Sequence, residues 1–194
     1  MSVVTLFLAL AFVQNLVLNT GIGASVLVRM SKKRRNIGTF SIWLTVFAVL
    51  TMLIVYPLDK LIGTDMVAKW LRPLMIIAVT AALYVATVLV LRRWRPAWYD
   101  RFARVLPMAA FNNVVIGIVL IVNHQFALSL GGALGVSLGA CVGFFLLALL
   151  TAEGIQRLDN PGVPKAFRGL PVALLYLGVL ALALMGFAGS VPLL

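Results

Sequence analysis

The sequence predicts an all-α integral membrane protein with six transmembrane helices, arranged as an inverted 3 + 3 repeat in which helices 1 and 4 are broken. Composition indicates the class: 63% of the residues are hydrophobic, 11% are charged and the mean hydropathy is +1.11, whereas soluble domains carry about 25% charged residues. Length indicates the number of helices, because 194 residues hold about six spans of roughly 20 residues with short loops. The distribution of charged and uncharged polar residues indicates the repeat.

Two stretches of uncharged polar residues interrupt apolar runs at corresponding places in the two halves. Residues 12–25 and 106–117 carry carboxamides and glycines that a continuous lipid-facing helix does not need. Paired helix breaks are typical of internal pseudo-symmetry, with a functional centre where the halves meet. Alternatively, the amides only bond neighbouring helices and the glycines only allow close packing. The residues predicted to form the polar centre at the helix breaks are Gln14, Asn15, Asn19, Ser25, Asn112 and Asn113.

The first expected span is too long for one straight helix. Residues 3–28 carry no charge, and as a continuous helix they would measure about 39 Å against a hydrocarbon core of about 30 Å. We therefore expect the helix to tilt or break, with the break between Asn19 and Gly23. The five basic residues of segment 29–35 then form a stop signal suited to anionic headgroups.

Prolines mark the expected ends of the next two spans. The second span covers residues 37–56 and is expected to end at Pro57, because proline removes a helix hydrogen bond. A loop of mixed charge is expected over residues 58–72. Pro73 suits the first turn of a third helix that ends at Leu91, because proline is favoured at the first helical position.

The second repeat, residues 105–194, follows the first repeat, residues 1–91, through a basic and aromatic segment. This segment, residues 92–104, interleaves arginines with aromatic side chains and is expected to lie in the membrane interface. The three further spans are expected at residues 105–122, from about 126 to 152, and from 170 to the C-terminus. The fifth span carries a predicted close-packing face at Gly131, Gly132, Gly135, Gly139 and Gly143.

Basic residues are distributed unequally between the expected loops. Thirteen of the 16 Lys and Arg residues lie after spans one, three and five, and the other three lie after span two. Basic loops face the cytoplasm, so both termini are expected on the non-cytoplasmic side. With three spans in each half, the second half then enters the membrane inverted relative to the first.

The residue types exclude several functions. The acidic residues lie in expected loops or at span ends, and no Lys or Arg lies inside a span, so the chain alone is not expected to pump ions through membrane carboxylates. His124 is the only histidine and is more consistent with a structural role than with metal binding. Cys141 is the only cysteine and can form no internal disulfide. No catalytic residue and no metal site are predicted. No nucleic-acid partner is predicted either, because the net charge of +11 comes from the basic loops that set the membrane topology.

Several segments of the chain resemble a known family. The most specific are residues 163–169 and 184–189, and weaker similarities lie at residues 13–15, 31–33 and 106–112. Together they resemble the six-helix membrane subunits of the Rnf and Nqr ion-translocating oxidoreductases, within the RnfA/NqrE branch. The resemblance implies a multi-pass subunit of the bacterial inner membrane, in a complex that couples electron transfer to ion translocation. It also implies three classes of partner: membrane lipids, a second six-helix subunit related by pseudo-symmetry, and other redox subunits.

The sequence departs from that family at its centre. In the family, two paired subunits each place two cysteines at the helix breaks, and together they hold a two-iron iron-sulfur cluster. Aligned on the flanking motifs, these positions are Ser25 and Asn113. Neither residue forms the thiolate that such clusters normally require, so this chain is expected to contribute no iron ligand and no cofactor of its own. We therefore expect a non-catalytic subunit; the alternatives are a small permease or channel component and an assembly scaffold.

Overall fold

The computed structural model describes residues 3–13, 15–31, 34–62, 66–125, 129–158 and 162–188. Every regular element in these ranges is a helix, which confirms the all-α membrane class. Three helical segments are long and apolar enough to cross a membrane: Asn36–Leu61, Trp70–Trp94 and Leu130–Leu158. The described residues also contain a bent pair of helices, Pro96–Phe102 with Leu106–Leu120, that together reach this length, and two shorter apolar helices, Val3–Phe12 and Leu170–Leu184. Six complete spans and the inverted repeat remain predictions.

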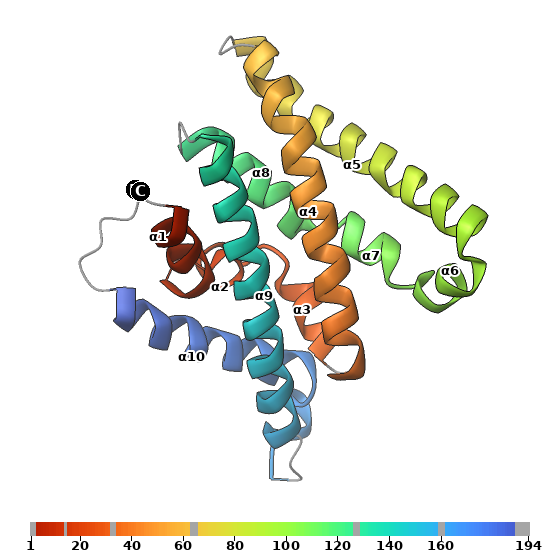
Figure 1. The fold of residues 1–194 in the computed structure, drawn as a ribbon. Helices are drawn as coiled ribbons and strands as arrows, with labels where there is room; N and C mark the ends of the chain where they lie inside the picture. The colour runs from red at the N-terminus through yellow and green to blue at the C-terminus, as the bar shows by residue number, and fades with distance from the viewer. Residues whose placement is uncertain are drawn as a thin grey trace.

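The long helices α4 (Arg34–Ile62) and α9 (Leu130–Leu158) form the centre of the fold (Figure 1). They pack against each other along their length. Buried aromatic side chains lie between them: Phe40 of α4 and Phe144 of α9 are fully buried, with ring centroids 5.7 Å apart. The parts of α4 and α9 around these two aromatic side chains are uncharged. In an apolar medium, such helices associate through close packing.

The first expected span is divided into four short elements. These are α1 (Val3–Leu8), the π-helical η1 (Ala9–Val13), α2 (Leu16–Thr20) and α3 (Ala24–Ser31). The fourth expected span is divided into α7 (Leu106–Ala110) and α8 (Asn113–Gln125). Both predicted breaks are therefore present in the structure.

The predictions made from the two prolines were wrong. Helix α4 continues through Pro57 to Ile62, and α5 (Met66–Trp94) begins before Pro73, so most of the expected loop is helical. A proline removes only one backbone hydrogen bond, and transmembrane helices tolerate this loss. An ion pair joins the two helix ends, because Nε of Arg72 lies 2.6 Å from Oδ1 of Asp59.

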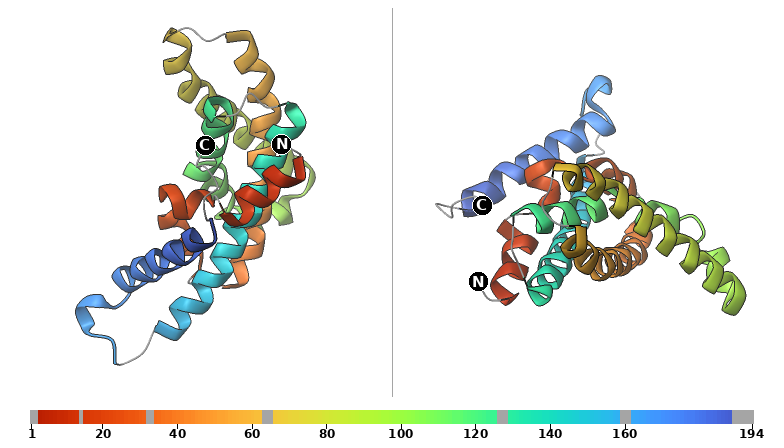
Figure 2. Two further views of the ribbon diagram at one scale, coloured as in Figure 1. Left: turned by 90° about the vertical axis from the view of Figure 1, so that its left-hand side faces the viewer. Right: turned by 90° about the horizontal axis from the view of Figure 1, so that it is seen from above.

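Two helices diverge from the central pair. α5 and α10 (Leu170–Ala188) extend toward opposite sides of α4 and α9, as Figure 1 and the right-hand view of Figure 2 show. Both expose large apolar side chains along their length. Between α5 and α7, the expected basic segment forms the short helix α6 (Pro96–Phe102). The turn η2 (Lys165–Phe167) precedes α10.

The two halves contact each other reciprocally. The broken segment of the first half, α1 and η1, packs on α9 of the second half, whereas α7 and α8 of the second half pack on α4 of the first. The third helix of each half contacts the broken segment of the other: α5 contacts α7 and α8, and α10 contacts η1 and α2. Each polar break is thus enclosed by helices of the opposite half.

The predicted close-packing face of α9 is confirmed at Gly135, Gly139 and Gly143. A Cβ atom at Gly139 would overlap the backbone of Phe7, and one at Gly135 would lie 3.1 Å from the carbonyl oxygen of Val3. Only glycine lets the backbone of α1 and η1 approach α9 so closely. This contact with α9 fixes the position of α1 and η1, which lead into the first break.

Candidate functional site at the helix breaks

The first break begins at Asn15, which caps the N-terminus of α2. Its Oδ1 accepts a hydrogen bond from the backbone N–H of Val17 at 3.1 Å, and its side chain is buried. Asparagine is a favoured N-cap because its side-chain oxygen satisfies an N–H that the helix cannot pair. The sequence analysis did not predict this cap, although an Asn directly before an apolar run is a recognisable helix-start signal.

The second part of the same break is a glycine turn. α2 ends at Gly21, which has a φ of 71° and donates its N–H to the carbonyl of Val17 at 2.9 Å. Gly23 has a φ of 85° and precedes the first residue of α3. Left-handed backbone of this kind favours glycine. The break predicted between Asn19 and Gly23 is therefore confirmed at its glycine end.

The break in the second half uses the same cap with fewer residues. Oδ1 of Asn112 accepts the N–H of Val114 at 3.1 Å, and its carbonyl accepts the N–H of Val115 at 2.9 Å. Asn112 is 1% exposed, and its Nδ2 atom is buried without a hydrogen-bond partner among the described residues. A buried donor without a partner is costly at membrane depth. No described residue therefore accepts a hydrogen bond from this nitrogen atom at the polar centre.

The two breaks touch each other at Gly23. A Cβ atom there would overlap the side chain of Val114 and would lie 3.5 Å from Oδ1 of Asn112 and 3.8 Å from Cε2 of Phe144. At the neighbouring position on α9, a Cβ atom at Gly143 would lie 2.8 Å from Nδ2 of Asn15. The structure therefore brings both capping asparagines against one stretch of α9, by way of residues that are distant in sequence.

The other predicted site residues have different positions. Ser25 lies in the first turn of α3 and Asn113 is the first residue of α8, and both are exposed. The backbone of Asn19 lies in α2 and that of His124 lies in α8, but their side chains lie outside the described part of the structure. Gln14 lies outside the described residues altogether. Cys141 is buried in α9.

The donor chemistry at the two exposed positions does not fit an iron-sulfur cluster. Ser25 offers a hydroxyl and Asn113 a carboxamide, whereas such clusters are held by cysteine thiolates. Among the described residues, no group of three or more His, Cys, Asp or Glu side chains could hold a metal ion. What the site does offer is uncharged hydrogen-bond donors and acceptors at the start of two helices from opposite halves.

Comparisons with known proteins cover nearly the whole chain. The model of a family described as "Rnf-Nqr subunit, membrane protein" matches residues 3–191. The chain is 29% identical over 189 residues to one subunit of the Na⁺-translocating ferredoxin:NAD⁺ oxidoreductase complex of Acetobacterium woodii, covering 97% of this chain and 98% of the relative. It is 33% identical over 189 residues to one subunit of an ion-translocating oxidoreductase complex of Cronobacter sakazakii, covering 96% of each chain. The corresponding subunit of Syntrophotalea carbinolica is 32% identical over 180 residues, 93% of each chain.

Proposed function

We infer that this chain is an integral membrane subunit of an ion-translocating oxidoreductase complex, because it belongs to the Rnf-Nqr family of membrane subunits. One observation carries the inference: the family model matches residues 3–191, which include both helix breaks and the long helices around them. The relatives are named as subunits of such complexes. Neither the permease nor the scaffold alternative has a comparable observation in its favour.

Within the complex, we propose that the helix-break centre supplies uncharged polar groups and no iron ligand. Ser25 and Asn113 hold the positions that carry cysteine in the family the sequence resembles, and their side chains cannot provide thiolates. Both are exposed, so they are accessible to a neighbouring subunit. Electrons that cross the membrane beside this chain then use a cofactor held by other subunits.

We also propose the topology of an inverted 3 + 3 repeat in the bacterial inner membrane, with both termini on the non-cytoplasmic side. The unequal distribution of Lys and Arg supports this orientation through the preference of basic loops for the cytoplasm. The exchange of contacts between the halves supports the repeat. Lys32→Cys and Arg95→Cys variants should react with a membrane-impermeant thiol reagent only from the cytoplasmic side, and labelling from the outside would contradict the topology.

A second six-helix subunit is the partner that we propose for the break face. Polar groups at a break in lipid need hydrogen-bond partners, and a pseudo-symmetric chain would supply them. The isolated chain should therefore be poorly stable in detergent and should gain stability on co-purification. A monodisperse, thermostable monomer would contradict this partnership.

The decisive experiment is to purify the complex in mild detergent through a tag on this chain. We expect redox subunits to co-purify, and we expect the iron and acid-labile sulfide per complex to be the same for the wild type and for a Ser25→Ala/Asn113→Ala double variant. Gln156→Ala, at an exposed polar residue near the end of α9, is the matched control. Loss of iron in the double variant, or a two-iron cluster in contact with either side chain, would overturn the proposal that this chain holds no iron.

A further inference from the structure

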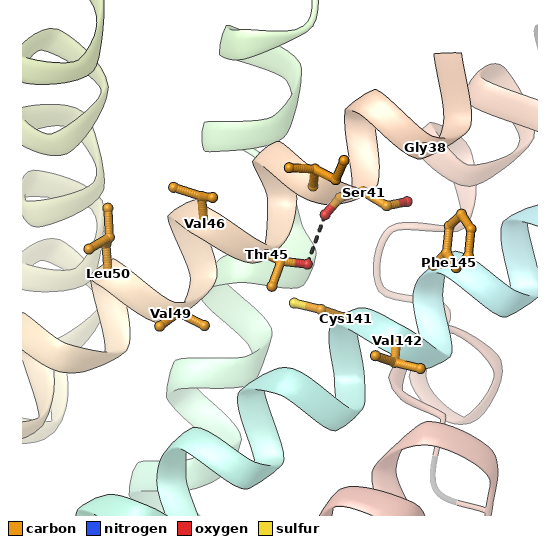
Figure 3. A pocket seen from close by; sticks show the side chains of 10 residues that line it. Gly38, Ser41, Thr45, Val46, Val49, Leu50, Cys141, Val142 and Phe145 are labelled. Atoms are coloured by element: carbon orange, nitrogen blue, oxygen red, sulfur yellow. Dashed lines mark hydrogen bonds between the residues drawn. The ribbon is translucent and has the colours of Figure 1, made fainter. Parts of the chain in front are cut away.

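Two exposed regions of the chain differ in how far they select a ligand. A groove of about 620 Å³ lies between α4 and α9 (Figure 3), and none of its described lining residues is charged. Acyl chains and apolar helices fit such a lining equally well, so the groove selects neither. The corner where α5 ends and α6 begins (Figure 1) is strongly basic instead. We call residues 92–104 the arginine corner.

Positive charge in the arginine corner is not neutralised within the described chain. Its charged residues are Arg92, Arg93, Arg95, Asp100, Arg101 and Arg104. All six are exposed, and among the described residues no salt bridge joins any of the five arginines to a carboxylate. Clustered positive charge of this kind attracts anions, so the corner is a candidate binding surface for an anionic partner.

The type of basic residue narrows the chemistry of that partner. Every basic residue of the arginine corner is an arginine, whereas the basic segment 29–35 mixes three arginines with two lysines. A guanidinium group is planar and donates two parallel hydrogen bonds to a phosphate or a carboxylate, which an ammonium group cannot do. The corner is therefore suited to oxyanions of these two kinds.

Side-chain contacts hold α6 in place against the rest of the chain. Nη2 of Arg92 donates a hydrogen bond to the hydroxyl of Tyr99 at 2.7 Å, and Cζ of Arg92 lies 4.4 Å from the centroid of that ring. At the other end of α6, the ring of Phe102 packs edge-on against Trp43 of α4, with centroids 5.9 Å apart. Arg92 is thus a clamp within the chain, and the other arginines are presented by a fixed corner.

The arginine corner lies where the lipid headgroups begin. The membrane-length segment Trp70–Trp94 ends inside it, and the preceding turn of α5 exposes Leu89 and Val90. Trp94 is 78% exposed and Trp98 is 55% exposed. Exposed tryptophans are typical of headgroup depth, because the indole ring is apolar and carries one polar N–H. At this depth the oxyanions next to the arginines are the phosphates of phospholipids.

We propose that the arginine corner selectively binds the phosphate groups of anionic phospholipids, with Arg95 and Arg101 as the contacts. Arg101 follows the exposed Trp98 by three positions, so the indole and the guanidinium group are neighbours on the surface of α6. Basic clusters at the end of a membrane span attract anionic lipids. In the proposed topology the lipids belong to the cytoplasmic leaflet. This binding goes beyond the proposed function, because it does not require that the chain works within a complex.

The test is site-specific photo-crosslinking in intact membranes, before any detergent is added. A benzophenone amino acid replaces Ala97, which is exposed one turn before Arg101, and mass spectrometry identifies the lipid adducts by headgroup. We expect anionic headgroups to be about fivefold over-represented relative to their share of the membrane. The control is the same probe at Val179, an exposed apolar residue of α10, which should react with lipids in proportion to the membrane composition.

Charge variants then test the assigned contacts. Arg95→Gln/Arg101→Gln should return the anionic share of the adducts to that of the membrane. Arg157→Gln/Lys165→Gln removes the same charge from exposed residues elsewhere and should leave the enrichment unchanged, while thermal unfolding shows whether each variant folds. Full enrichment in the first pair would overturn the assignment of Arg95 and Arg101. Arg95→Lys/Arg101→Lys keeps the charge without the parallel hydrogen bonds, and full enrichment there would overturn the bidentate contact.

Three other outcomes would overturn the proposal. An adduct with an acidic segment of another subunit would show that a protein covers the corner. Lipid adducts in proportion to the membrane composition would show that the corner lies among headgroups without selecting them. Loss of the enrichment in inorganic phosphate, but not in chloride of equal ionic strength, would assign the site to free phosphate. The proposed function is unaffected by all three, since it fails only if no redox subunit co-purifies with the chain.

Discussion

The two helix breaks perform the same capping with different amounts of chain. In both, the Oδ1 of a buried asparagine accepts the N–H of the residue two positions later: Asn15 with Val17, and Asn112 with Val114, each at 3.1 Å. The first break then adds a short helix and a turn with positive φ at Gly21 and Gly23, whereas the backbone at Phe111 keeps a φ of −90°. The asparagine cap is therefore the common element, and the glycine turn is particular to the first half.

The difference has a packing reason. Gly23 lies where the first break meets the second, so close to Val114 that a Cβ atom would overlap it. One side of this contact must be bare backbone for the other side to keep its branched side chain. The two halves use the same asparagine cap at their helix breaks. They differ at the contact between the breaks, where the first half has a glycine and the second half has a branched side chain.

The largest effect is expected from Gly23→Ala. The added methyl group would overlap the side chain of Val114, and the backbone would keep a φ of 85° that L-residues rarely adopt. Overpacking and left-handed strain each cost about 1–3 kcal/mol, so we expect this variant to be strongly destabilised. The measurement is the midpoint of thermal unfolding in detergent. Gly21→Ala is the control, because it shares the positive φ but its Cβ atom meets nothing within 4 Å; equal losses would refute the packing reason.

A smaller loss is expected where α9 supports the first break. In Gly143→Ala the new Cβ atom would lie 2.8 Å from both the carbonyl oxygen of Ala11 and Nδ2 of Asn15, so α9 and η1 must move apart at a cost of about 1–3 kcal/mol. Thermal unfolding measures it, and Gly178→Ala on α10, where a Cβ atom meets nothing within 4 Å, should be close to neutral. If both variants unfold at the wild-type temperature, α9 does not hold the break in place.

The two asparagine caps should respond alike. Asn15→Ala and Asn112→Ala each remove one capping hydrogen bond, at a cost of about 0.5–2 kcal/mol. Asn112→Ser should recover most of the loss, because serine also caps and it eliminates the unpartnered Nδ2 atom. Chemical unfolding of the three variants provides the comparison. A loss at only one of the two caps would show that the breaks are not equivalent.

The smallest effect is expected at the exposed first-turn residues. Ser25→Ala and Asn113→Ala change surface side chains and should alter stability by less than about 0.5 kcal/mol. A role in the complex would then appear as a fall in the electron-transfer or ion-transport rate at unchanged unfolding temperature. If stability and rate are both unchanged, these two side chains have no function beyond occupying the positions.

The sequence by itself determined the membrane class, the places of both breaks and the glycine face of α9. Each depends on properties that are local along the chain: hydropathy, the preference of glycine for positive φ and the fourfold spacing of small residues. The extents of α4 and α5 could not be predicted in this way, because the effect of Pro57 and Pro73 depends on whether neighbouring turns and lipid tolerate one lost hydrogen bond.

Only the tertiary structure decided what covers each small or polar residue. Nothing near Gly23 in sequence indicates that the side chain of Val114 lies against it. Whether such a residue is covered depends on segments tens of residues away, so it follows from how the halves exchange contacts. For that reason the sequence could predict which residues form the breaks, and the fold alone could show that the breaks touch.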